Sequence, residues 1–260
     1  MRSNGISVIS NRRHISLPTE DILYIQLAGR RAVIHASGGR WAEKNKVTRL
    51  SGHNQGMYTM KEIIKRADVL GIKYLTVYAF STENWKRSQE EVGGIFNLLV
   101  KFVGSELAEL SANNVKVHML GDYEKVPQSA VKSIEKAVNA TKDNTGLQFN
   151  IALNYGSRAE IARAARRAAE EAAAGRINTE DIDEEMISRY LYTGDENGNI
   201  PDPDLIIRTS GEQRLSNFLL WQAAYSELYF TKCLWPDFDE AQLQLAVTEF
   251  SKRKRRYGGI

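Results

Sequence analysis

The sequence predicts a single-domain α/β protein with a central, mostly parallel β-sheet flanked by helices. Short apolar runs with strand character alternate with segments of helical periodicity, an order typical of a parallel sheet covered by helices. The apolar runs are nearly continuous, as expected of strands that are buried on both faces. A chain of 260 residues, 42% of them hydrophobic, is also long enough to bury one large core.

The predicted strands are short segments rich in β-branched and aromatic residues. In chain order they are Val33–Ala36, Ile72–Phe80, Val115–Leu120, Gln148–Asn154 and Asp204–Arg208, with a further candidate at Glu227–Phe230. Residues 1–32 follow no clear pattern, and Ile22–Leu27 within them fits either an extra strand or an amphipathic arm. We therefore expect an N-terminal arm over residues 1–32 and one folded domain over residues 33–260.

The predicted helices lie between these strands. Their approximate ranges are Gln55–Leu70, Gln89–Ala112, a segment that starts at Pro127, Ser157–Ala174, Asp183–Tyr192, Leu215–Ala224 and Asp239–Arg255. Ser88 and Glu91 have the spacing of a capping box at the start of the second helix, and Ser157 and Glu160 repeat that spacing at the fourth. One apolar stripe of the second helix comprises Val92, Phe96, Leu99, Val103, Leu107 and Leu110.

Charge and cysteine content exclude several functional classes. The 35 basic and 32 acidic residues leave a net charge of +3, which is too small for a surface that binds nucleic acid throughout. The basic run Lys252–Arg256 is most often a solvated helix end, with contact to anionic lipid head groups as the alternative. The single cysteine, Cys233, excludes an internal disulfide and fits a reducing cytosol.

The sequence also bears on membrane association. No apolar run approaches the roughly 20 residues that a membrane-spanning helix needs. Residues Met1–Thr19 lack the apolar core of a secretory signal. We therefore expect a cytoplasmic protein whose membrane contact is at most peripheral, at the inner face.

The most informative segment is the turn that follows the second predicted strand. Within Tyr78–Arg87 it gathers a hydroxyl, a carboxylate, an amide, an indole and a guanidinium, from Ser81, Glu83, Asn84, Trp85 and Arg87. A turn built only for its shape would use Gly, Pro, Asn or Asp. Ligands in open α/β sheets bind just beyond the carboxyl ends of the strands, so we expect this turn to contact a ligand.

Three Arg-bearing loops are candidate anion sites. The first, Ser37-Gly38-Gly39-Arg40-Trp41, can present backbone N–H groups as an anion nest, although an ordinary Gly-rich turn fits as well. The second, Arg49–His53, precedes a helix whose N-terminus attracts anions, although a solvated cap also fits. The third, Arg208–Asn217, contains two Arg residues and two Ser residues, with a salt bridge to Glu212 as the alternative. Three such loops together favour anion binding.

Metal binding has one candidate residue. Glu227 lies at the last predicted strand and could hold Mg²⁺, although a surface or paired carboxylate is the simpler interpretation. The sequence has no His-x-x-His or Cys-x-x-Cys spacing. A zinc site is therefore not expected.

Together these residues resemble the cis-prenyltransferase family, most closely its bacterial members that form undecaprenyl diphosphate. The resemblance runs from about Gly39 to the C-terminus. It is carried by Gly39-Arg40-Trp41-Ala42, Arg49 with Gly52-His53, Tyr78–Arg87, Asn154-Tyr155-Gly156, Arg208–Phe218, Tyr225–Phe230, Trp235–Phe238 and Arg256-Tyr257-Gly258. It implies a hydrophobic tunnel, a homodimer, Mg²⁺ as cofactor, and the transfer of an allylic prenyl group from its diphosphate to isopentenyl diphosphate.

The resemblance also implies roles for the matched side chains. The residues implied to hold the allylic diphosphate are Arg40, Arg49 and His53. Those implied to shape the reacting centre are Ser81, Asn84, Trp85 and Arg87. Those implied to hold isopentenyl diphosphate are Arg208, Arg214 and Ser216. The wider substrate-binding set adds Ser37, Gly38, Gly39, Trp41, Thr82, Glu83 and Leu215. The implied catalytic residues are Arg40, Ser81 and Asn84, the last assisting proton removal. Glu227 would join the Mg²⁺ site, and Arg256-Tyr257-Gly258 would complete the site across the dimer.

The chain departs from the family at the first loop. The family pattern Met-Asp-Gly-Asn-Gly-Arg-Trp-Ala corresponds to residues 35–42, so Ala36 replaces the Asp that organises Mg²⁺ and Gly38 replaces the Asn. A methyl group cannot bind a cation, and Ser37 could supply only one weak oxygen ligand. We expect the fold and both anion pockets to survive, and Mg²⁺ affinity and turnover to fall.

Three functions fit this pattern. The leading one is a transferase that elongates a prenyl chain, slowed or altered by the first loop. The second is a non-catalytic partner subunit, and the third is a synthase that couples or cyclises short allylic diphosphates irregularly. A further explanation is that residues 1–38 are an artefact and not natural sequence. That would explain why the first motif is abnormal while the downstream motifs are normal.

Overall fold

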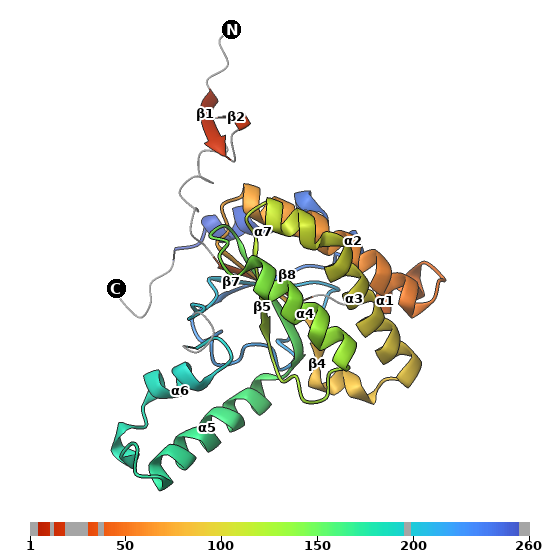
Figure 1. Cartoon of the computed structure of the whole chain (residues 1–260). Helices are drawn as coiled ribbons and strands as arrows, with labels where there is room; N and C mark the ends of the chain where they lie inside the picture. Colours follow the sequence, from red (N-terminus) through yellow and green to blue (C-terminus); the bar gives the residue numbers. More distant parts are fainter. Residues whose placement is uncertain (1–4, 11–12, 19–30, 36–38, 195–198, 255–260) are drawn as a thin grey trace.

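The computed structural model describes residues 5–10, 13–18, 31–35, 39–194 and 199–254 (Figure 1). Its centre is a six-stranded sheet in the order β5-β6-β4-β3-β7-β8, in which every pairing is parallel. The strands are β3 (Arg31–His35), β4 (Tyr74–Ser81), β5 (Lys116–Leu120), β6 (Gln148–Tyr155), β7 (Leu205–Arg208) and β8 (Glu227–Phe230). The predicted α/β class and all six strands are confirmed.

The N-terminal residues form a separate element. Strands β1 (Gly5–Ser10) and β2 (Arg13–Pro18) pair antiparallel in a sheet of their own. The predicted element Ile22–Leu27 lies outside the described residues. The division at residue 32 therefore stays a prediction.

Seven α-helices and three short 3₁₀ helices are assigned within the described residues. The α-helices are α1 (Gly39–Lys44), α2 (Arg49–Val69), α3 (Gln89–Ala112), α4 (Gln128–Thr141), α5 (Ser157–Ala173), α6 (Glu184–Tyr190) and α7 (Glu240–Ser251). The 3₁₀ helices are η2 (Thr82–Lys86), η3 (Thr179–Asp181) and η5 (Trp235–Asp237). Helix α2 packs against α3 and α7, whereas α5 and α6 pack together and extend away from the sheet as an arm (Figure 1). No helix in the described ranges combines the length and apolar character needed to cross a bilayer.

Helix α2 begins six residues earlier than predicted. The Thr48 side chain accepts a hydrogen bond from the Ser51 backbone N–H at 3.2 Å, so Thr48 caps a helix that starts at Arg49. The predicted anion segment Arg49–His53 is therefore the first turn of α2 rather than a loop before it.

Two predictions about the second half of the chain are wrong. Leu215–Ala224 forms turns instead of a helix, because Ser216, Asn217 and Leu219 have φ angles of 51°, 62° and 47°, which a right-handed helix cannot include. The capping box at Ser157 is also absent. Gly156 is the N-cap residue of α5, and the buried Glu160 carboxylate instead accepts hydrogen bonds from other parts of the chain.

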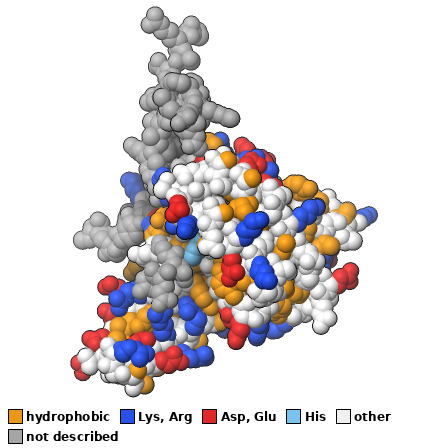
Figure 2. Space-filling model, viewed as in Figure 1, with side chains coloured by type: hydrophobic (Ala, Val, Ile, Leu, Met, Phe, Trp, Pro, Cys, Tyr) orange, Lys and Arg blue, Asp and Glu red, His pale blue; other side chains and the backbone are white. Residues whose placement is uncertain are grey.

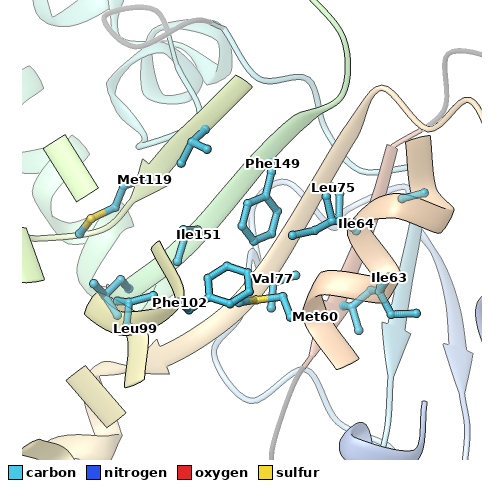
Figure 3. Close-up of a cluster of buried hydrophobic side chains, with 14 of the residues drawn as sticks. Met60, Ile63, Ile64, Leu75, Val77, Leu99, Phe102, Met119, Phe149 and Ile151 are labelled. Atoms are coloured by element: carbon cyan, nitrogen blue, oxygen red, sulfur yellow. The ribbon is translucent and has the colours of Figure 1, made fainter. Parts of the chain in front are cut away.

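The main core lies between the sheet and helices α2 and α3. Figure 3 shows side chains of α2, α3, β4, β5 and β6 that converge there. The α3 stripe members Phe96, Leu99 and Val103 are 2%, 1% and 4% exposed, because this stripe faces the sheet. Apolar side chains fill this space, and the predicted tunnel for a growing chain stays a prediction.

A smaller core lies on the opposite face of the sheet. Tyr78 of β4 stacks on Phe218 with a ring-centroid distance of 4.2 Å and an interplanar angle of 9°. Tyr155 of β6 meets both rings edge-on. These contacts hold the 215–222 segment against the carboxyl end of the sheet.

The core assignment predicts a difference between two Leu→Ala substitutions in helices. Leu99 is 1% exposed in α3, whereas Leu245 is 45% exposed in α7. We expect Leu99→Ala to lower the free energy of unfolding by about 2–5 kcal/mol, because it leaves a cavity. The matched Leu245→Ala should cost less than about 1 kcal/mol. Urea unfolding followed by circular dichroism measures both, and equal losses would contradict the assigned core.

Candidate active site

The register of three neighbouring strands brings the candidate loops together. His35 of β3 pairs with Tyr78 of β4 on one side and with Arg208 of β7 on the other. All three strands run parallel, so the segments that follow them leave the sheet at one edge. The Ser81–Arg87 turn and the Thr209–Asn217 segment therefore lie at the same edge of the sheet.

A cavity of about 500 Å³ opens at this edge. Its polar wall is made by side chains from α2, the β4–η2 turn, β7 and the 216–217 turn: His53, Ser81, Glu83, Asn84, Arg87, Arg208, Ser216 and Asn217. Its apolar wall is made by Met57, Met60, Val77, Ala79, Ile95 and Trp235. The cavity therefore combines a wall of charged and hydrogen-bonding groups with a wall of apolar side chains. This combination suits a ligand with an anionic head and a hydrocarbon tail.

The turn after β4 is held by local hydrogen bonds. The Asn84 Oδ1 atom accepts from the Ser81 backbone N–H at 3.0 Å, which fixes both residues beside the cavity. Trp85 instead turns toward the core, where its ring lies 5.1 Å from Phe80, and its Nε1–H donates to Asn154 Oδ1 at 2.7 Å. Trp85 therefore supports the turn from behind and does not line the cavity.

A single carboxylate organises the cationic wall. Glu91 Oε1 contacts His53 Nε2 at 3.2 Å and accepts from Arg87 Nη1 at 2.8 Å, while its Oε2 accepts from Arg49 Nη1 at 3.2 Å. The sequence interpretation assigned Glu91 only to a helix cap, a role it also fulfils through its backbone N–H. The capping-box spacing concealed its second role, and only the fold brings α2 and α3 together at this point.

Burial and neighbouring charges determine the protonation of this cluster. Burial lowers the pKa of His53 below its ordinary value of 6.5, although the hydrogen bond to Glu91 opposes that shift. Burial would raise the pKa of Glu91. The hydrogen bond from His53 and the positive charges of Arg87 and Arg49 outweigh it, so the pKa is lowered overall. At neutral pH the cluster therefore contains a neutral imidazole, an anionic carboxylate and two guanidinium groups.

The third predicted anion loop divides into two parts. Arg208 is buried at the end of β7 and lines the cavity together with Ser216. The Arg214 side chain is 63% exposed and forms an ion pair with Glu212, which is the alternative that the sequence left open. Leu215 packs against the smaller core. Arg208 and Ser216 of this loop therefore line the cavity.

Three other predicted residues lie outside the cavity, and one of them is Arg49, whose exposed side chain pairs with Glu91. Trp41 donates from Nε1 to Asp237 Oδ1 at 2.6 Å, and Thr82 lines a neighbouring cavity. Gly39 and Arg40 begin α1. The residues outside the described ranges are Ala36, Ser37, Gly38 and Arg256-Tyr257-Gly258. The roles predicted for these residues, and for the Arg40 side chain, remain predictions.

The predicted metal ligand lies apart from the polar wall. Glu227 is the first residue of β8, level with Leu205 at the start of β7, whereas Arg208 ends β7. Its Oε2 atom accepts from Arg253 Nη1 at 2.7 Å. Across the described ranges, no three Asp, Glu, His or Cys side chains gather as a metal site would require. The described residues of one chain therefore do not fit a Mg²⁺ site by themselves.

A larger cavity of about 910 Å³ lies between β5, α4 and the arm of α5 and α6. Its cationic residues are Lys116, Lys142, Arg163, Arg166, Arg167 and Arg189, and Figure 2 shows basic and acidic side chains mixed over the arm. Of the predicted site residues that the structure describes, only Thr82 lines this larger cavity. Chemistry rather than volume therefore identifies the smaller cavity as the candidate active site.

The cluster around Glu91 predicts acid sensitivity in two steps. His53 and Glu91 both have lowered pKa values in the folded protein, so the unfolded chain binds more protons. Stability should fall as the pH drops below about 6.5 because of His53, and further below about 4.5 because of Glu91. Urea unfolding between about pH 8 and pH 3 measures this dependence.

Two substitutions separate these contributions. His53→Gln should flatten the upper part of the pH dependence, and Glu91→Gln the lower part. His118, whose pKa burial lowers to about 4, adds a loss of stability between about pH 6.5 and pH 4 in every variant and cancels in the comparison. An unchanged slope in both variants would contradict this electrostatic description.

Comparisons with known proteins agree with the chemistry of this cavity. A prenyltransferase family model described as "Putative undecaprenyl diphosphate synthase" matches residues 35–258. The isoprenyl transferase of Clostridium perfringens is 49% identical over 229 residues, covering 88% of this chain and 89% of the relative. The isoprenyl transferase of Streptococcus pneumoniae R6 is 51% identical over 228 residues, covering 88% and 90%.

Two crystal structures share the fold. Lavandulyl diphosphate synthase from Lavandula x intermedia, in complex with dimethylallyl diphosphate, matches with a TM-score of 0.85 and 37% identity, covering 90% of this chain and 99% of that one. A "probable undecaprenyl diphosphate synthase" from Campylobacter jejuni matches with a TM-score of 0.71 and 30% identity, covering 88% and 98%. The predicted resemblance is confirmed, and the chain belongs to the prenyltransferase family of isoprenyl transferases and undecaprenyl diphosphate synthases.

Proposed function

We propose that the protein condenses isopentenyl diphosphate with an allylic primer similar to farnesyl diphosphate. The product would be a cis-polyprenyl diphosphate such as undecaprenyl diphosphate, the precursor of a lipid carrier for cell-wall synthesis. The observation that carries this proposal is the cavity at the strand ends, because it joins a cationic, hydrogen-bonding wall to an apolar wall. Two diphosphates and one hydrocarbon tail require both surfaces.

The two substrates would occupy different parts of the polar wall. His53 and Arg87 lie on the α2–α3 side, where the allylic diphosphate would bind. Arg208 and Ser216 lie at the end of β7 and in the following turn, where isopentenyl diphosphate would bind. Ser81 and Asn84 come from the turn after β4 and would meet the reacting carbons.

The reaction makes one carbon–carbon bond and breaks one carbon–oxygen bond. The alkene electrons of isopentenyl diphosphate attack the first carbon of the primer, whose bonding pair to oxygen leaves with the diphosphate. A proton then leaves the isopentenyl C2 carbon and a cis double bond forms. Guanidinium groups stabilise the charge on the departing diphosphate. The departing diphosphate can take up this proton, and Asn84 can orient the diphosphate oxygen that does so, because the Asn84 side chain is fixed to Ser81.

The apolar wall would receive the prenyl tail. Met57 and Met60 of α2 and Ile95 of α3 line it, and Figure 3 shows Met60 among the core side chains. Methionine side chains adapt their rotamers readily. A lengthening tail could therefore enter between α2 and α3 by displacing these side chains.

Magnesium, dimer formation and location belong to this proposal as well. A Mg²⁺ ion that arrives on a diphosphate needs only one or two protein carboxylates, and Glu227 stays the candidate although it lies at the opposite end of β7 from Arg208. A homodimer is supported by apolar exposure beside edge strand β8, where Tyr225 is 72% and Phe230 38% exposed. We also propose a cytoplasmic enzyme with peripheral membrane contact. Within the basic run, Lys252 forms an ion pair with Glu249 and Arg253 forms one with Glu227, so these two charges are already partly balanced within the chain.

Product analysis tests the proposed reaction. Radiolabelled isopentenyl diphosphate, farnesyl diphosphate and Mg²⁺ should yield long cis-prenyl products with the wild-type protein. No product at any Mg²⁺ concentration would favour a non-catalytic partner subunit. Short branched or cyclic products from dimethylallyl diphosphate alone would favour irregular coupling. Either outcome would overturn the proposal.

The role of Asn84 predicts a loss of turnover without a loss of binding. Asn84→Ala removes both the amide and its bond to Ser81, and should lower kcat by about 100-fold. Asn84→Asp keeps an oxygen that can accept from Ser81 N–H, so it separates the effect of chemistry from that of loop geometry. Steady-state kinetics measure both variants. A normal kcat for Asn84→Ala would exclude Asn84 from the reacting centre.

The first loop predicts a gain of function. Ala36→Asp introduces the carboxylate that the family carries at this position, and should raise kcat/KM by about 100-fold at low Mg²⁺ concentration. Ala36→Asn has a similar size without the charge and serves as the control. Equal activity of both variants and the wild type would show that this carboxylate is not what limits the reaction.

A further inference from the structure

We propose that Asn217 and Glu83 form a positioning pair that locks the third anion loop, Arg208–Asn217, onto the reacting-centre turn and thereby sets the affinity for isopentenyl diphosphate. The inference rests on the proposed function, because it assigns the β7 side of the cavity to that substrate. Both residues line the cavity, but they come from segments that are distant in sequence. Glu83 belongs to η2 after β4, and Asn217 directly follows Ser216.

Asn217 is fixed by three hydrogen bonds that use its backbone and both ends of its amide. Its carbonyl oxygen accepts from the Ser157 backbone N–H at 2.8 Å. Its Oδ1 atom accepts from the Arg158 backbone N–H, also at 2.8 Å. Its Nδ2 donates to Glu83 Oε1 at 2.9 Å. One side chain thus joins the start of α5, the third anion loop and the reacting-centre turn.

The bond to Arg158 explains how α5 begins without a capping side chain of its own. The N-cap residue is Gly156, which has no side-chain acceptor. Asn217 Oδ1 satisfies the N–H of the second helical residue, which an N-cap side chain normally does. The third anion loop is therefore attached to a rigid element of the fold.

Close packing leaves little freedom at this junction. A Cβ atom at Gly156 would lie 2.5 Å from Thr82 Oγ1 and 2.8 Å from Asn217 Nδ2, so a larger residue would force the three segments apart. Asn217 and Ser216 have φ angles of 62° and 51°. Asn adopts this left-handed region more readily than most residues. The segment after Asn217 is attached to the same helix start, because the Leu220 backbone N–H donates to Ser157 Oγ at 2.9 Å.

Glu83 is the acceptor that selects the orientation of the Asn217 amide. Burial would raise the pKa of Glu83, but the hydrogen bond from Asn217, together with further bonds inside the turn, lowers it overall. Thr82 Oγ1 donates to the other carboxylate oxygen at 3.3 Å. Glu83 is therefore an anionic acceptor at neutral pH. It holds the Nδ2 side of Asn217 toward the turn and leaves Oδ1 for Arg158.

The position of the pair explains why it should affect one substrate. Ser216 lines the cavity beside Asn217, and Arg208 lies at the other end of the same loop. If Asn217 lost these hydrogen bonds, Ser216 could move away from the position where isopentenyl diphosphate would bind. The allylic side is built from α2 and α3 and is held by its own bonds to Glu91. Affinity for the primer should therefore change little.

Exchanging the donor and acceptor provides the sharpest test. Asn217→Asp keeps an oxygen for Arg158 but sets two carboxylates against each other. Glu83→Gln in the same chain supplies an amide that can donate to the new carboxylate at position 217, so the hydrogen bond returns with reversed polarity. Isothermal titration with isopentenyl diphosphate measures binding for the wild type, both single variants and the double variant. The KM values for isopentenyl diphosphate and farnesyl diphosphate form a second readout.

We expect Asn217→Asp to weaken isopentenyl diphosphate binding by about 10-fold or more, and Glu83→Gln alone to have a smaller effect. The double variant should return to within about threefold of the wild type. The KM for farnesyl diphosphate should change by less than about threefold throughout. Asn139→Asp, the same substitution at an exposed position of α4, should leave binding unchanged.

The outcomes separate the inference from the proposed function. A double variant that binds no better than Asn217→Asp, while the wild type binds normally, would overturn the pair and leave the proposed function intact. A loss of thermal stability with unchanged binding would reduce the pair to a structural role and would also overturn the inference. A wild type that does not bind isopentenyl diphosphate would overturn both.

Discussion

The structure depends on the parallel register of β3, β4 and β7. Because His35 pairs with both Tyr78 and Arg208, three strands that are distant in sequence end at the same edge of the sheet, with β4 running three residues further, to Ser81. Parallel strands need crossover connections, and the helices that provide them bury both faces of the sheet. A shift of one residue would turn the buried side chains of these strands to the opposite face. The packing that keeps the core closed therefore also keeps the candidate site assembled.

Polar contacts between the loops complete what the register begins. On one side, the Glu91 carboxylate draws together cationic side chains from α2 and the turn after β4. On the other side, Asn217 connects the segment after β7 to the start of α5 and to Glu83. Both centres join distant parts of the chain, because 38 residues separate His53 from Glu91 and 134 separate Glu83 from Asn217. Such contacts cost little when the backbone is already held by the sheet, because few groups remain to be ordered.

Much of the fold was predictable because its signals are local. The six strands are short apolar runs, and helices such as Gln89–Ala112 carry a capping residue and a regular stripe. The predicted helix Leu215–Ala224 failed because tertiary contacts of Asn217 and Phe218 override its local pattern. The candidate site was predictable in part, as motifs whose residues His53, Asn84 and Arg208 line the cavity. The second role of Glu91 was not, because nothing in its local sequence indicates the approach of α2.

A crystal structure with both substrates bound tests the central claim most directly. Isopentenyl diphosphate and a non-reactive thio-analogue of farnesyl diphosphate, supplied with Mg²⁺, would be the ligands. The account predicts two diphosphates in the cavity at the strand ends, one beside His53 and the other beside Arg208 and Ser216, with the prenyl tail against Met57 and Met60. Two bound diphosphates outside this cavity, or a prenyl tail that points away from α2 and α3, would contradict it.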